Sequence, residues 1–227
     1  MTSQARSAEE GFVRQFASRL GVHWVIKAVG LTLGITAFFA AYFRVLNHPF
    51  FPLTIMPLTG VDRLIGFQPW TLPLYLSLWV YVPLAFVLLR TRREMLRCGV
   101  AALLLSVSGL AIFLLWPTAV PALAINWAAH PSFAFLKSVD ASGNACPSLH
   151  VAFAVFTAVR LGPIWRELGA SVAVRAGSWL WCAGIVFSTM ATGQHVAVDA
   201  LAGAVLGMGV AVAFRQKGRE VTWSRLA

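Results

Sequence analysis

Charged residues are scarce in this 227-residue chain, where Asp, Glu, Lys and Arg together make up 11% of the sequence. A soluble domain of this size carries about a quarter charged residues. Hydrophobic residues make up 59% of the chain, and its mean hydropathy is +0.75. This composition excludes an ordinary soluble domain and predicts an integral membrane protein.

Acidic residues are the scarcer kind of charge, with 8 of them against 18 Lys and Arg residues and a net charge of +10. In a soluble protein this excess would suggest a nucleic-acid partner. Here the basic residues lie between apolar runs and set the orientation in the membrane, so we expect no nucleic acid.

The few carboxylates form no cluster for magnesium. The three cysteines lie in separate segments and give neither a disulfide framework nor metal-ligand spacing. We therefore expect no metal and no cofactor.

Six apolar runs, separated by polar or broken segments, predict six transmembrane helices. They cover residues 24–43, 69–89, 99–116, 147–159, 176–192 and 195–214. The predicted fold class is all-α, an integral membrane bundle of six helices. Around the membrane catalytic domain of residues 23–214 we expect a cytosolic amphipathic tail, 1–22, and a basic cytosolic tail, 215–227.

Six spans place both termini on the same side of the membrane. If that side is the cytoplasm, only Arg44, Arg63 and Lys137 of the 18 basic residues fall outside, and the other fifteen fall inside. This strong bias agrees with the positive-inside rule. It predicts cytoplasmic termini in a bacterial-type inner membrane.

An imidazole and a carboxylate lie four residues apart in the stretch Ser188-Thr-Met-Ala-Thr-Gly-Gln-His195-Val-Ala-Val-Asp199. Positions i and i+4 share a face of a helix, so we expect Asp199 to accept a hydrogen bond from His195. That bond would fix the tautomer and leave the other ring nitrogen free to attack or to take a proton. Taken alone, the motif fits equally well a buried His–Asp pair whose only role is the hydrogen bond between the two side chains.

A second motif, Cys146-Pro147-Ser148-Leu149-His150, opens the fourth predicted span. We expect Pro147 at the first helical position, where its missing N–H costs nothing. The free N–H groups of that turn, together with the Ser148 hydroxyl, then form an anion site suited to phosphate. In the six-span topology His150 and His195 both lie at the outer face, so we expect the two rings to meet.

These two motifs resemble the second and third signatures of the type 2 phosphatidic acid phosphatase superfamily, usually written P-S-G-H and S-R-x5-H-x3-D. The stretch from Asp62 to Thr71 also resembles the branch that contains inositol phosphorylceramide synthases. The resemblance implies that His195 attacks phosphorus and becomes a phosphohistidine, with Asp199 holding its ring. It also implies that His150 protonates the leaving alkoxide and that Ser148 binds phosphate oxygens.

The chain departs from these signatures in its positive charges. Thr189 stands where the family has arginine, Leu149 replaces a glycine, and the first signature, K-x6-R-P, is not visible. Thr189 can donate a hydrogen bond but no charge, whereas phosphoryl transfer requires positive charge at the phosphate. The outward cations Lys137, Arg44 and Arg63 are therefore the candidate phosphate-binding residues.

The leading hypothesis is a lipid phosphatase or head-group phosphotransferase that acts at the outer, periplasmic face on a lipid phosphate or phospholipid. The acceptor, water or an alcohol, and the oligomeric state stay open. A proton-coupled lipid transporter or flippase is one alternative, although no inverted repeat is detectable and the ionisable groups lie at one mouth. A catalytically dead membrane scaffold is another, because the motif arginines are missing.

Overall fold

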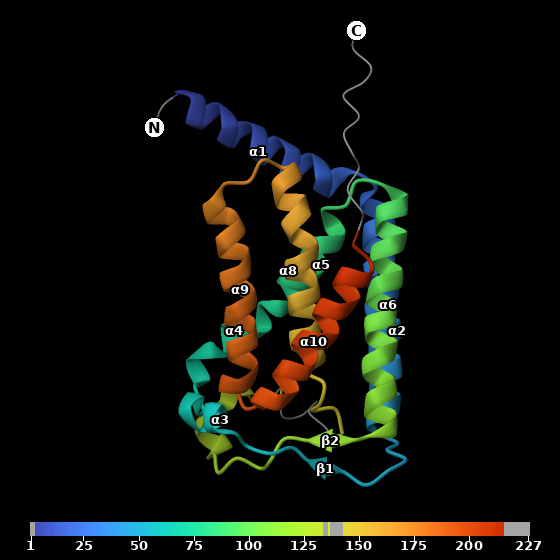
Figure 1. The fold of residues 1–227 in the computed structure, drawn as a ribbon, viewed down its shortest axis with the longest axis vertical. Helices are drawn as coiled ribbons and strands as arrows, with labels where there is room; N and C mark the ends of the chain where they lie inside the picture. Colours follow the sequence, from blue (N-terminus) through green and yellow to red (C-terminus); the bar gives the residue numbers. More distant parts are fainter. Residues whose placement is uncertain (1–2, 134–135, 137–142, 216–227) are drawn as a thin grey trace.

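The structure, a computed structural model, describes residues 3–133, 136 and 143–215. Within them the chain forms a bundle of helices with a layer of short elements at one end, drawn at the bottom of Figure 1. The helices are α1 (Ser3–Gly21), α2 (Trp24–Leu46), α3 (Gly60–Ile65), α4 (Leu72–Leu76), α5 (Leu78–Val87), α6 (Arg92–Leu115), α8 (Leu149–Glu167), α9 (Val172–Ala191) and α10 (Ala197–Ala213). The predicted all-α class is confirmed.

Four helical segments among the described residues are long and apolar enough to cross a membrane: Trp24–Leu46, Pro69–Val87, Arg92–Leu115 and Val172–Ala191. They correspond to the first, second, third and fifth predicted spans. Helix α10 has 17 residues, or about 25 Å at 1.5 Å per residue, and the hydrocarbon core is about 30 Å thick. The six-span topology and the cytoplasmic termini stay predictions.

Helix α8 is the centre of the bundle, because α5, α6, α9 and α10 all pack on it. Fully buried side chains lie on several of its sides, including Val151, Ala152 and Thr157. A helix enclosed by other helices does not need a lipid-facing surface, so it can carry polar residues near its end. Helix α8 accordingly continues past its predicted limit at residue 159 and includes Arg160 and Arg166.

Two glycines of α10 allow it to approach α8 unusually closely. A Cβ atom at Gly203 would lie 2.2 Å from the carbonyl oxygen of Ser148, and one at Gly207 would lie 2.2 Å from that of Ala152. Residues three to four apart share one helix face, so both glycines press on α8 together. This packing joins the start of α8 to the middle of α10.

The amphipathic N-terminal segment forms α1, which lies across the opposite end of the bundle (Figure 1). Phe16 stacks on Trp165 of α8 with a centroid distance of 6.3 Å, and Arg19 pairs with Glu167 at 3.0 Å. Lys27 of α2 is buried and donates from Nζ to the carbonyl oxygen of Arg19. Phe12 also contacts Trp165, with a centroid distance of 6.5 Å, so apolar and polar contacts together fasten the segment to the bundle.

Three connecting segments meet at the end opposite α1. Strand β1 (Thr54–Ile55) pairs in parallel with β2 (Thr118–Ala119), with Thr54 opposite Thr118. Thr118 also forms a bridge with Asn144 on the chain that leads into α8. The start of α8 is therefore tied to two connections distant in sequence, and the candidate site lies next to this junction.

Candidate active site

The side chains of His150 and His195 meet at the loop end of the bundle, with 3.2 Å between His150 Nδ1 and His195 Nε2. His150 lies in the first turn of α8, and His195 lies in the connection between α9 and α10. Gly193, at φ 70°, turns this connection. The backbone N–H of His195 donates to the carbonyl oxygen of Thr189. The convergence predicted from the two motifs is confirmed by this distance.

The ring pair belongs to a longer chain of hydrogen bonds. His195 Nδ1 lies 3.1 Å from the carbonyl oxygen of Ala145, and His150 Nε2 lies 2.8 Å from the hydroxyl oxygen of Tyr75. A carbonyl oxygen only accepts, so Nδ1 of His195 carries the proton, and its Nε2 is an acceptor. His150 Nδ1 must then donate to His195, and the Tyr75 hydroxyl donates to His150 Nε2. This assignment leaves both rings neutral, with the lone pair of His195 Nε2 directed at His150.

Asp199 does not make the hydrogen bond to His195 that was expected from their spacing. Its Oδ2 lies 3.7 Å from His195 Nδ1 and accepts from the backbone N–H of Val196 at 3.0 Å. The expectation was wrong because α10 begins at Ala197, so His195 precedes the helix and the i, i+4 rule does not apply to it. Asp199 is fully buried and its Oδ1 has no partner among the described residues. Its charge still acts on the ring over this short distance.

Helix α8 begins two residues later than expected, so Ser148 is its N-cap and Pro147 lies outside the helix. The Ser148 hydroxyl oxygen accepts from the N–H of Val151 at 3.3 Å, and the side chain is fully buried. Its backbone N–H donates to the carbonyl oxygen of Asp199 at 3.0 Å. In this structure Ser148 therefore closes the start of α8 and joins it to α10. The N–H groups of Leu149 and His150 have no intrahelical acceptor by position and remain available to an anion.

The candidate phosphate-binding cations do not gather at the two histidines in the described residues. Arg44 and Arg63 are exposed, in the last turns of α2 and α3, and none of the contacts described for this part of the chain joins them to either ring. Lys137 lies outside the described residues. Thr189 is buried, and its hydroxyl donates to the carbonyl oxygen of Val186 at 2.8 Å within α9.

Asp62 joins the short helix α3 to the start of α10. Its Oδ1 accepts from the backbone N–H of Ala197 at 2.7 Å, and its Oδ2 accepts from the N–H and hydroxyl of Thr59 at 2.7 and 2.6 Å. Burial raises the pKa of Asp62, but the hydrogen bonds from Thr59 and Ala197 outweigh this and hold the pKa below its ordinary value. The carboxylate thus fastens the helix that follows His195.

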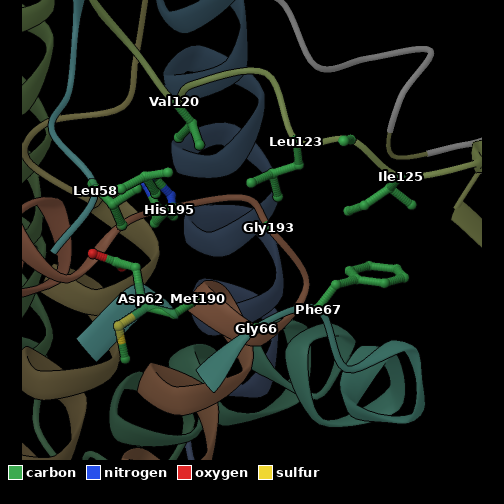
Figure 2. Close-up of a pocket in the computed structure, with 12 residues that line it drawn as sticks. Leu58, Asp62, Gly66, Phe67, Val120, Leu123, Ile125, Met190, Gly193 and His195 are labelled. Carbon is green, nitrogen blue, oxygen red and sulfur yellow. The ribbon is translucent and has the colours of Figure 1, made fainter. Parts of the chain in front are cut away.

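Next to His195 lies a mainly apolar cavity of about 230 Å³. In Figure 2 the side chains of Val120, Leu123 and Ile125 lie along one side of this space, and Phe67 and Met190 lie along the other. His195 and Asp62 are the ionisable residues of its lining. The carboxylate of Asp62 disfavours a phosphate in this space, which therefore suits an uncharged, apolar group.

The described residues contain no group of three or more His, Cys, Asp or Glu side chains that could hold a metal ion. Among families of known proteins, the model described as the PAP2 superfamily matches residues 69–213. The matched range contains Tyr75, His150, His195 and Asp199. The comparison with curated proteins gave no match, and the comparison with solved structures gave none either.

Proposed function

Because the chain belongs to the PAP2 superfamily, a group of phosphatase-type enzymes, we propose that it cleaves or transfers the phosphate group of a lipid phosphate or phospholipid through His195. The observation that carries this proposal is the contact of 3.2 Å between His195 Nε2 and His150 Nδ1. It joins a ring nitrogen that has a lone pair to a second ring that can supply a proton. In the six-span topology this pair lies at the outer face of the membrane.

In the first step Nε2 of His195 attacks phosphorus, so an N–P bond forms as the P–O bond to the leaving group breaks. The leaving alkoxide takes a proton from His150, which must enter this step protonated on both nitrogens. The Tyr75 hydroxyl supports that form as well as the neutral one, because its oxygen can accept from Nε2–H. Water or an alcohol then attacks phosphorus, so a new P–O bond forms as the N–P bond to His195 breaks, and the attacking oxygen gives a proton back to His150.

The ring of His195 gains positive charge when its Nε2 bonds to phosphorus. Two groups next to Nδ1 offset this charge: the Ala145 carbonyl at 3.1 Å and the Asp199 carboxylate at 3.7 Å. Asp199 is fully buried, and Coulomb attraction is stronger where water is excluded. Asp199 is thereby proposed to stabilise the phosphohistidine by charge.

The lipid part of the proposal is supported by the apolar cavity and by the outer surface of the bundle. The cavity reaches His195 and suits an alkyl group next to the phosphate. Large apolar side chains such as Leu33, Leu103 and Leu180 are more than half exposed on α2, α6 and α9, as expected of helices that face lipid. A substrate dissolved in the membrane can reach a site at the end of such a bundle.

The test uses purified protein in detergent with two matched substrates, a long-chain phosphatidic acid and glycerol 3-phosphate. We expect release of phosphate from the lipid, and transfer to an added alcohol if the chain is a transferase. His195→Gln should abolish both reactions. An alkaline quench with ³²P-labelled lipid should trap labelled wild-type protein. If wild type and His195→Gln released phosphate equally, His195 would not be the nucleophile; equal rates on the two substrates would overturn the lipid assignment alone.

A further inference from the structure

We propose that Thr118 is a positioning residue for the reaction, because it directs the carbonyl oxygen of Ala145 at Nδ1 of His195 and so sets the tautomer of the nucleophile. This inference rests on the proposed role of His195. No motif contains Thr118, which lies in strand β2, 77 positions before His195 in the printed sequence. Its effect passes through one peptide group.

The peptide group between Ala145 and Cys146 is held at both ends. Its N–H, that of Cys146, donates to the hydroxyl oxygen of Thr118 at 2.7 Å. Its carbonyl oxygen, that of Ala145, lies 3.1 Å from Nδ1 of His195. A trans peptide group is planar and directs its N–H and C=O in opposite directions. Fixing the N–H on Thr118 therefore fixes the direction of the carbonyl towards His195.

The backbone of Thr118 holds the same segment in register. Its carbonyl oxygen accepts from the N–H of Gly143 at 3.1 Å and from the N–H of Ala145 at 3.0 Å. The Thr118 side chain is fully buried, so water cannot replace its hydroxyl without a local rearrangement. Three bonds from a single residue thus define where the Ala145 carbonyl lies.

The hydroxyl of Thr118 matters for chemistry because the two tautomers of His195 differ in reactivity. With the proton on Nδ1, Nε2 has the lone pair that attacks phosphorus; with the proton on Nε2, it has none. Asp199 does not replace the carbonyl as hydrogen-bond partner in this geometry, since its Oδ2 is 3.7 Å from Nδ1. Loss of the carbonyl's direction thus lowers the fraction of reactive His195.

The test compares Thr118→Val, which keeps the shape and the backbone bonds, with Thr118→Ser, which restores the hydroxyl. Thr118→Val should lower kcat about 10- to 100-fold, the range for an angstrom-scale misplacement of a reacting group, with KM little changed. Thr118→Ser should recover most of the activity. Thr118→Cys, with a weakly accepting sulfur, should have a kcat between those of the valine and serine variants. If the valine variant does not fold, the comparison of Thr118→Cys with Thr118→Ser tests the proposal. Thr54→Val is the control, because Thr54 pairs with Thr118 in the strands and its hydroxyl bonds Trp116 instead.

A second readout is independent of turnover. ¹⁵N spectra of histidine-labelled protein report the tautomer of each ring, and the His195 signals are identified by their absence in His195→Gln. The wild type and Thr118→Ser should show the proton on Nδ1, and Thr118→Val should show a mixture. An unchanged tautomer in Thr118→Val, or a kcat equal to that of Thr54→Val, would overturn the proposal. If the wild type had no phosphatase activity, the spectra would still decide the role of Thr118, whereas the proposed function would fail separately.

Discussion

Replacement of Gly203 by alanine is expected to separate α8, which carries His150, from α10, which directly follows His195. The new Cβ would lie 2.2 Å from the carbonyl oxygen of Ser148 and 3.3 Å from its Cβ. That oxygen cannot move aside alone, because it accepts from Ala152 in the first turn of α8, and the Ser148 N–H donates to Asp199 of α10. Relief of the clash therefore requires α10 to move away from α8 by more than about 1 Å, since ordinary carbon contacts lie near 3.5–4.0 Å.

Two opposing energies determine the effect on stability. Overpacking a tight contact costs about 1–3 kcal/mol, whereas alanine in place of glycine in a helix gains about 1 kcal/mol. A net destabilisation of about 0–2 kcal/mol follows from these two values. The effect on catalysis is expected to be larger, because a displacement of about 1 Å at a reacting group can lower the rate about 100-fold.

The measurement combines thermal unfolding in detergent with kcat on a lipid phosphate. Gly209→Ala is the matched control, because it lies on the same helix and a Cβ there meets no atom within 4 Å. The control should be as stable as the wild type or more stable, with normal kcat. If Gly203→Ala behaved like Gly209→Ala in both measurements, the claim that close packing of α10 on α8 sets the distance between the two histidine rings would be refuted.

Three further predictions concern single side chains. His150→Ala should reduce turnover of an alkyl phosphate about 10²- to 10⁴-fold, but that of an aryl phosphate much less, because a good leaving group needs no acid; equal losses on both would contradict the acid role. The pKa of Asp62 lies below its value in the unfolded chain, about 3.9, so its stabilisation is complete above about pH 4 and is lost as the pH falls through the folded pKa. Unfolding temperatures of Asp62→Asn should consequently depend less on pH below 4 than those of the wild type, and parallel curves would exclude this role. Lys137→Gln should lower both turnover and inhibition by vanadate, with Arg44→Gln and Arg63→Gln as comparisons; three fully active variants would exclude a clamp from these residues.

The meeting of the two histidines could be predicted from sequence because two independent patterns pointed to it. The motifs supplied the residue types, and the distribution of basic residues placed both at one face. The helix start at Ser148 and the helix limit near Ala197 were less predictable, since capping depends on one or two residues. The later start of α10 has a chemical consequence, because it leaves His195 outside the helix. The hydrogen-bond partner of His195 Nδ1 is therefore the Ala145 carbonyl, and Asp199 lies near the ring without bonding to it.

Other parts of the site had no sequence signal that could have revealed them. Every residue has a backbone carbonyl, so nothing marks that of Ala145 until the loops are placed. Tyr75 lies 75 positions before His150 on a different helix, and one buried tyrosine in an apolar segment has an ordinary packing explanation. The predicted fourth span ends at residue 159 because Arg160 and Arg166 indicate a turn, whereas α8 continues through both and is enclosed by four other helices. Asp62 was visible as part of a family-like stretch, whereas its bond to the start of α10 required the fold.

The resting contact between the rings implies that the substrate must open the pair before it reacts. In-line transfer places phosphorus about 3 Å from Nε2 and an acid nitrogen about 3 Å beyond the leaving oxygen, so the two nitrogens must be about 7 Å apart, whereas they are 3.2 Å apart here. His195 is buried and held by Ala145 and Thr189, while His150 is only partly buried, so His150 is the ring that moves. A ligand opens such a pair only if it interacts better with the open state. A phosphate does so because it can accept from the His150 ring and from the free N–H groups at the start of α8, whereas the dephosphorylated alcohol offers neither charge nor a second acceptor. If the proposed function holds, we expect the closed pair to favour binding of the phosphorylated lipid over its product.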